Sequence, residues 1–308
     1  MPGWAQETVV LGFKGHVHTV YTESSKSEDG LHWESMDSSL DVYDPTGYQV
    51  EFFRYNPDGS LVAHTVYTRN GPQVLRIQAT GATPSESSST QNVFDAKGLV
   101  VETDTYDGNG VLVSKSKNEL VQKRGNTTMY HRREIAADGS EKVAEVTETT
   151  DPETGMTHQI QTTDGKLDTD WVIQRNPDGT EKDKIVYGNG AYNEREIRAD
   201  GTTVEDRYSD GIKTHTYQKT DAQGHLIEVI QQSESYYIRC TYSFDKEGRP
   251  TGQINYDESG KILDKSTIEY HDDSYGNWVE KKSIAWNTAT EPMQAKIVEI
   301  SLRTINYY

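Results

Sequence analysis

Residues 241–270 decide the fold, and they read TYSFDKEGRPTGQINYDESGKILDKSTIEY. The run Phe244–Gly248 (FDKEG) is followed twelve residues later by Tyr256–Gly260 (YDESG), so an aromatic residue, Asp, two variable residues and Gly recur. The Asp carboxylate accepts a hydrogen bond from an amide two residues on, and Gly adopts a positive φ without steric cost. The short segments between the turns are rich in Ile, Thr and Tyr, which is typical of strands. The stretch therefore predicts consecutive β-hairpins.

The same turn recurs along the chain. Gly47, Gly59 and Gly71 end three such turns at a constant spacing of twelve residues, and Phe94–Gly98 and Tyr106–Gly110 repeat that spacing. Self-similarity at a fixed period indicates a repeat architecture. No segment carries the apolar stripe of an amphipathic helix. We therefore predict an all-β protein in which antiparallel hairpin repeats form one long curved or barrel-like sheet, as a single domain over residues 1–308.

Two segments depart from the repeat. Residues 79–91 (ATGATPSESSSTQ) are rich in Ser and Thr, and we predict a flexible loop there. Residues 295–308 are predicted as a C-terminal capping strand, because an uncovered sheet edge invites pairing with other chains. We expect this strand to pair with the N-terminal strand region Val9–Thr22. An inner strand of the sheet and an edge strand of a second chain are the alternative partners.

Composition limits the possible functions. The formal net charge of −18 disfavours binding to nucleic acid and to anionic membrane surfaces. No apolar run approaches the roughly 20 residues that a membrane-spanning helix needs. Cys240 is the only cysteine, so no intrachain disulfide is possible, and we expect a buried and inert thiol. The N-terminal Met1–Glu7 contains Gly3-x-Ala5, which resembles the end of a secretory signal and supports export.

The recurring turns resemble the YD repeats of Rhs-like secreted bacterial proteins. Gly276-Asn277-Trp278 and the final residues Arg303–Tyr308 (RTINYY) add to this resemblance, which covers most of Tyr43–Tyr308. It implies hairpins that wind into a large curved sheet, closed in long members into a shell around a toxin. It also implies a secreted, extracellular or periplasmic location. This chain is short, lacks the Asp-Pro-x-Gly-Leu signature at its C-terminus and has no toxin domain after Tyr308, so we do not expect self-cleavage.

Metal sites have two sets of candidates. His16 and His18 are two residues apart on an expected strand, so both imidazoles would share a face, but a zinc site needs a third protein ligand. His18 also belongs to a pentapeptide, HTVYT, that recurs at residues 64–68. The acidic stretches Asp104–Gly110 and Asp164–Asp170 are candidate calcium sites, although neither has EF-hand spacing. We expect no resident cofactor.

Aromatic residues are the remaining candidates. Trp33, Trp278 and Trp286 lie in polar surroundings, and exposed aromatics stack on sugars and anchor interfaces. The chain has no Gly-x-Ser-x-Gly, His-Glu-x-x-His or phosphate-binding Gly loop, so we expect no enzyme activity. Our first hypothesis is a non-enzymatic structural or interaction protein with a protein or glycan partner outside the cytoplasm. The alternatives are a glycan-binding cell-surface protein, and a hydrolase or metalloprotein on a repeat scaffold.

Overall fold

The computed structural model describes residues 13–27, 31–81, 83–288 and 292–308, and these residues form 23 strands and one short 3-10 helix. The elements in chain order are β1 (Val17–Lys26), β2 (Glu34–Ser35), β3 (Ser38–Tyr43), β4 (Gln49–Tyr55), β5 (Leu61–Asn70), β6 (Gln73–Gly81), η1 (Pro84–Glu86), β7 (Ser88–Phe94), β8 (Val100–Asp107), β9 (Leu112–Arg124), β10 (Thr127–Ala136), β11 (Glu141–Thr150), β12 (Met156–Thr163), β13 (Lys166–Arg175), β14 (Glu181–Tyr187), β15 (Tyr192–Ile197), β16 (Thr202–Ser209), β17 (Ile212–Thr220), β18 (Leu226–Ser233), β19 (Tyr236–Phe244), β20 (Pro250–Tyr256), β21 (Ile262–Asp272), β22 (Trp278–Asn287) and β23 (Gln294–Tyr307). Within these ranges, no helix has the length and apolar character needed to cross a membrane.

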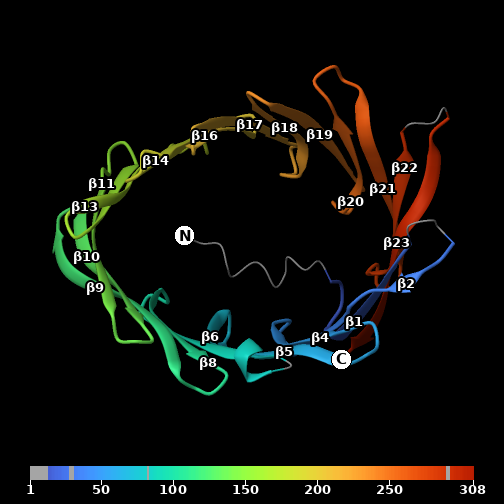
Figure 1. The fold of residues 1–308 in the computed structure, drawn as a ribbon, viewed down its shortest axis with the longest axis horizontal. Coiled ribbons are helices and arrows are strands. Elements are labelled where there is room, and N and C mark those ends of the chain that lie inside the picture. The colour runs from blue at the N-terminus through green and yellow to red at the C-terminus, as the bar shows by residue number, and fades with distance from the viewer. Residues whose placement is uncertain (1–12, 28–30, 82, 289–291) are drawn as a thin grey trace.

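The strands close into a ring (Figure 1). From β3 to β23, each strand pairs with the next in antiparallel fashion, and β1 pairs with β3 on one edge and with β23 on the other. The β1–β23 ladder runs from Val17 opposite Tyr307 to Lys26 opposite Glu299. The short β2 pairs with the C-terminal end of β1, at Ser25 and Lys26. It lies on the same edge of β1 as β3. The predicted all-β, barrel-like sheet is confirmed.

The closing pair is the intramolecular one that the sequence predicts. Strand β23 pairs with β1, which lies within the expected N-terminal region from Val17 onward. The earlier part of that region, and the signal-like Met1–Glu7, lie outside the described residues. Because β1 covers the edge of β23, the ring has no free edge at its C-terminal strand.

The Asp turns work as the sequence indicates. The Asp245 carboxylate accepts hydrogen bonds from the amides of Glu247 (3.0 Å) and Arg249 (2.8 Å). The Asp257 carboxylate accepts one from the amide of Lys261 at 2.9 Å, and Gly260 has φ +83°. Each turn therefore satisfies its own amides without help from the rest of the molecule.

The Ser/Thr-rich segment 79–91 differs from the prediction. Its first three residues end β6, and its residues 88–91 begin β7, where Ser88 and Ser89 pair with Ala79 and Gln78. Only residues 82–87 connect the two strands, and they include η1. Thr is common in strands as well as in loops. Composition alone therefore does not show that residues 88–91 form a strand.

The register of the ladders separates two faces of the sheet. Val17 and Val20 lie opposite Tyr307 and Ile305, so these side chains share one face. Phe13 packs on the same face, and the short blue stretch of residues 13–16 that precedes β1 lies inside the ring in Figure 1. This face is therefore the inner one.

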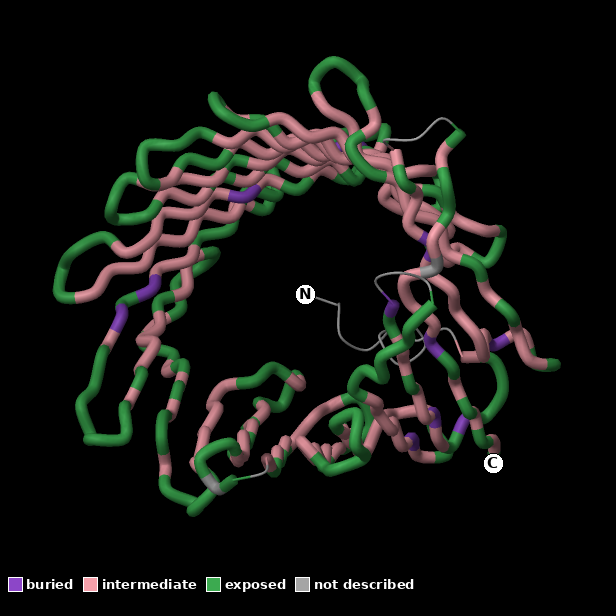
Figure 2. Tube along the Cα trace, turned by 45° about the vertical axis from the view of Figure 1, so that its right-hand side comes forward, coloured by how far each residue is buried: buried purple, intermediate pink, exposed green. Residues whose placement is uncertain are grey.

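Both faces remain largely exposed. The buried apolar residues are few, and six of them lie on the inner face: Val17, Val20, Tyr43, Ala144, Val146 and Ile173. Most strand residues are only half-buried (Figure 2). The accessible surface is 19505 Å², whereas a monomeric protein of 34.7 kDa typically exposes about 13,000 Å². In the described part of the chain, the ring is thus a single sheet layer with no second layer packed against it.

Candidate functional site

The candidate site lies where the two ends of the chain meet. The Asn277 amide accepts a hydrogen bond from the backbone amide of Lys14 at 2.6 Å and donates to the Lys14 carbonyl at 2.7 Å. It also donates to the Tyr307 hydroxyl at 2.7 Å. Asn277 is only 3% exposed, so this side chain fixes the segment before β1 against the β21–β22 turn and β23.

Arg303 of β23 points from this junction into the ring. Its guanidinium carbon lies 3.5 Å from the centre of the Trp278 ring and 5.2 Å from that of Phe13. The Nε atom is buried and has no hydrogen-bond partner. Among the described residues, no carboxylate lies within ion-pair distance of this guanidinium. Burial lowers the pKa of Arg303 to about 10, against the opposing influence of Tyr43 and Asp41.

Arg249 lies across the same space and has a different environment. It forms ion pairs with Asp272 (2.5 Å) and Asp245 (2.7 Å), and its guanidinium carbon lies 4.6 Å from the centre of the Tyr270 ring. The hydrogen bond with Asp272 is the main cause that raises the pKa of Arg249. Arg249 is therefore neutralised by its own partners, whereas Arg303 is not.

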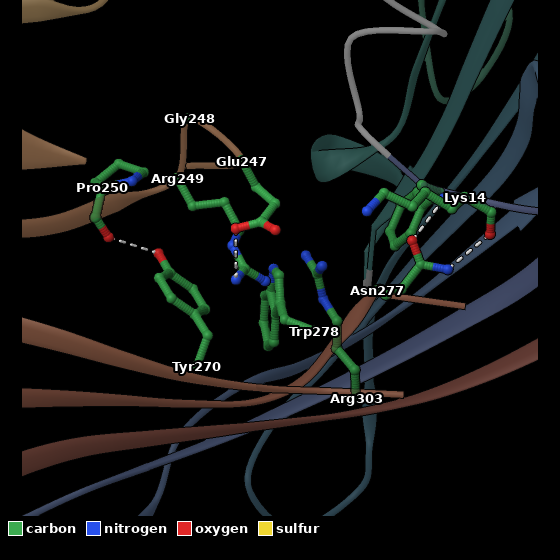
Figure 3. A pocket seen from close by; sticks show the side chains of 11 residues that line it. Lys14, Glu247, Gly248, Arg249, Pro250, Tyr270, Asn277, Trp278 and Arg303 are labelled. Carbon is green, nitrogen blue, oxygen red and sulfur yellow. Dashed lines mark hydrogen bonds and ion pairs between the residues drawn. The ribbon is translucent and has the colours of Figure 1, made fainter. Parts of the chain in front are cut away.

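These residues line a pocket of about 370 Å³. Its wall consists of Phe13, Lys14, Glu247, Gly248, Arg249, Pro250, Tyr270, Gly276, Asn277, Trp278 and Arg303. Figure 3 shows the guanidinium end of Arg303 directed into the space between Trp278, Lys14 and the turn that carries Glu247. The pocket thus combines aromatic surfaces, one carboxylate and cationic groups.

Acidic and phenolic groups beside Arg303 share its dry environment. Burial raises the pKa of Asp41, although a hydrogen bond from Gln49 (2.5 Å) and the Arg303 charge oppose this. Burial also raises the pKa of Tyr43. The electrostatic interaction of Arg303 with a nearby charge is therefore stronger here than it would be in bulk water.

The three predicted tryptophans do not form one site. Trp278 lines the pocket, but Trp286 is at the other end of β22 on the outer face, where its Nε1 donates to Thr267 at 3.1 Å. Trp33 lies between β1 and β2 and is 39% exposed. The structure therefore brings one of the three candidates into the pocket and leaves the other two apart.

The histidine candidates are not paired as alternation suggested. Strand β1 begins at Val17, so His16 precedes it, and a bulge between Val17 and Thr19 interrupts the alternation at His18. The His18 ring lies 4.7 Å from that of Tyr308. In the described part of the chain, no three His, Cys, Asp or Glu residues form a group able to hold a metal ion.

The acidic candidate stretches have internal partners. Asp107 accepts hydrogen bonds from the amides of Asn109 (2.9 Å) and Val111 (2.8 Å), and Asp168 accepts one from the Thr163 hydroxyl at 2.5 Å. The expectation of no resident cofactor, with these stretches as candidate calcium sites, stays a prediction. Cys240 is half-buried within β19, and burial raises the pKa of its thiol, which disfavours the reactive thiolate.

Sequence reasoning missed Arg303 as a site residue. Its signal was present, because Arg303 shares a strand face with Ile305 and Tyr307 and so places a charge among apolar neighbours. Phe13 and Trp278, which cover the guanidinium, come from far along the chain, and no local pattern connects them.

No family model matches the sequence, and no curated protein matches it. Among solved structures, a porin-like protein from Bacteroides uniformis is 10% identical, with a TM-score of 0.30 over 96% of this chain and 99% of that one. A Photorhabdus luminescens Tc holotoxin pore is 12% identical, with a TM-score of 0.19 over 86% of this chain and 22% of that one. These values are too low for any conclusion about activity.

Proposed function

We propose that this protein is a non-enzymatic interaction protein that receives its partner on the inner face of the ring. The observation that carries the proposal is the surface of 19505 Å² on a chain of 34.7 kDa, because no second layer of the described elements covers the inner face. A sheet face of this kind is available to a partner chain or glycan. The resemblance to YD-repeat proteins supports a location outside the cytoplasm.

The side chains of the inner face support this assignment. The inner face carries arginines together with aromatic residues such as Tyr130 and Trp171; the arginines are Arg54, Arg69, Arg132, Arg175, Arg195, Arg207 and Arg303. Arginine and aromatic residues are enriched in protein interfaces. Cross-strand ion pairs occur on both faces, for example Arg195 with Asp183 at 2.6 Å on the inner face and Lys184 with Glu194 at 3.2 Å on the outer face, so they do not distinguish the two.

The test compares the two faces at matched positions. Thr216 of β17 lies on the inner face, opposite Glu205 and Gln231, and Thr241 of β19 lies on the outer face, opposite Glu228 and Ile254. A photo-crosslinking amino acid is placed at either position, and the protein is illuminated in the extracellular fraction of its native producer. We expect a specific adduct from position 216 and none from position 241. Adducts that form equally from both positions, or from the outer position alone, would contradict the proposal.

Glycan binding is a second candidate, and the pocket around Trp278 is the observation that favours it. Tyr270 and Phe13 add aromatic surface there, and Glu247 adds a carboxylate that accepts hydrogen bonds from hydroxyl groups. A glycan array tests this candidate against wild type and Trp278→Ala. Binding that is unchanged in the variant would place any glycan site elsewhere.

The absence of enzyme activity stays a prediction. The pairs His64–Glu51 (2.9 Å), His158–Asp170 (2.8 Å) and His215–Asp206 (2.6 Å) resemble parts of a hydrolase site. They lie on three different hairpins of the outer face, where each joins neighbouring strands. This arrangement favours a role in cross-strand stabilisation.

A further inference from the structure

The Nε atom of Arg303 has no hydrogen-bond partner, and this points to a ligand. Buried polar groups are almost always hydrogen-bonded, and each exception asks for an explanation. Here the buried Nε of Arg303 has no partner, while Trp278 and Phe13 contact the guanidinium through their rings. Stacking of this kind leaves the in-plane N–H groups free to donate. Figure 3 shows that end of Arg303 facing the pocket.

Other stacked arginines of the ring have a polar partner for the guanidinium. Arg69, which lies over Tyr48 and Tyr67, donates from Nε to the backbone carbonyl of Gln49 at 2.9 Å, and two further arginines have carboxylates. Arg239 lies 5.3 Å from the centre of the Tyr256 ring and also donates to Glu228 at 2.6 Å. Arg249 stacks on Tyr270 and also has carboxylate partners. In both, an aromatic ring and a carboxylate complete the environment of the guanidinium. Arg303 has the aromatic rings without the carboxylate.

We propose that the pocket binds a small sugar acid whose single carboxylate is held by Arg303. The planar guanidinium fork matches a carboxylate and can donate two parallel hydrogen bonds to it. No carboxylate among the described residues forms an ion pair with the Arg303 guanidinium, so one ligand carboxylate can take that position. Glu247 in the wall and Asp41 beside Arg303 would repel the second charge of a phosphate. The proposal builds on the glycan candidate above and specifies its chemical class.

The rest of the pocket suits a polar ring. A volume of about 370 Å³ is near the lower limit for ligand pockets and accommodates one monosaccharide-sized group. Glu247 can accept hydrogen bonds from hydroxyl groups, and the Lys14 ammonium can donate to ring or hydroxyl oxygens. Phe13 and Tyr270 offer apolar surface to the C–H face of a sugar.

The first experiment needs no variant. Glucuronate and its neutral isostere glucuronamide are titrated into wild-type protein at pH 7 and low salt, with binding followed by calorimetry. We expect glucuronate to bind saturably and glucuronamide to bind at least about tenfold more weakly, because only the former completes the ion pair with Arg303. Equal affinities, or no saturable binding of glucuronate, would overturn the proposal.

The second experiment assigns the residue. Arg303→Met should lower glucuronate affinity at least about tenfold, and Arg239→Met, which removes a stacked arginine on the outer face, should leave it unchanged. If Arg303→Met does not fold, as judged by circular dichroism, Arg303→Lys is used, and it should weaken binding because an ammonium lacks the planar fork. Undiminished affinity in the folded variant would contradict the assignment. Glucuronate binding does not depend on crosslinking at position 216, so the two proposals fail separately.

Discussion

Gly260 shows how much of the fold rests on single turn residues. Its φ is +83°, and a Cβ added there would meet no atom within 4 Å. A side chain at position 260 is therefore disfavoured by the positive φ of the backbone and not by contacts with neighbouring atoms. We expect Gly260→Val to lower the free energy of unfolding by roughly 1–3 kcal/mol, since a β-branched residue strongly disfavours this region. Denaturant unfolding measures it.

Lys261 provides the matched control one residue away. Its side chain is exposed, and only its backbone amide takes part in the turn, through the bond to Asp257. Lys261→Val should change the unfolding free energy by less than about 0.5 kcal/mol. Losses of the same size at both positions would mean that the positive φ is not what the turn requires.

Asp273 makes the junction of the chain ends sensitive to acid. Burial alone would raise its pKa, but hydrogen bonds from Tyr307 and from the amides of Tyr275 and Asn277 outweigh this and lower it. A lowered carboxyl pKa contributes stability that is complete above the unfolded value of about 4 and is lost as the pH falls through the folded value. We therefore expect the melting temperature to fall below about pH 4, and to fall less steeply in Asp273→Asn. The same slope in both proteins would exclude this contribution.

At the residue scale, the sequence predicts the features that neighbouring residues form by themselves. The Asp–Gly turns follow from five neighbouring residues, so their hydrogen bonds could be anticipated at Asp245 and Asp257. The pocket could not be, because Phe13, Trp278 and Arg303 meet only after the ring closes. Trp33 and Trp286 have the same chemistry as Trp278, yet no local pattern shows which tryptophan reaches the inner face.

At the scale of elements, β23 is the strand on which closure depends. It pairs with β22 on one edge and with β1 on the other. Deletion of residues 295–308 would expose both edges and uncover Val17 and Val20, which pack against Ile305 and Tyr307. We expect the truncated chain to aggregate or to lose its cooperative unfolding, measured by light scattering and circular dichroism. A monomeric truncated protein of unchanged stability would show that closure is dispensable.

Strand β7 shows where element prediction fails. Its sequence, SSTQNVF, lacks the apolar alternation of the other strands, and only four residue pairs join it to β6. Its pairing with β8 is longer, from Ser88 opposite Asp107 to Phe94 opposite Val100. The strand is therefore held mainly by a neighbour whose register cannot be read from the Ser/Thr-rich segment itself.

For the whole molecule, the repeat predicts a curved sheet but not its closure. Curvature accumulates from the same twist and bulges at each hairpin, so a long hairpin array bends by default. Whether the two ends meet depends on strand number and tilt together. The net charge of −18 also disfavours a collapsed interior, since like charges repel one another across a compact core.

A hollow ring differs in size from a compact protein of equal length. A compact domain of 308 residues has a radius of gyration of about 19 Å. Twenty-two strands, all those described except β2, spaced about 4.8 Å apart and tilted by about 40°, give a ring radius of about 22 Å and a radius of gyration of about 23 Å. We expect small-angle X-ray scattering of the monomer to give the larger value, because the interior is solvent rather than protein. A value near 19 Å would mean that the sheet folds onto itself in solution, and the inner face would then not be free to receive a partner.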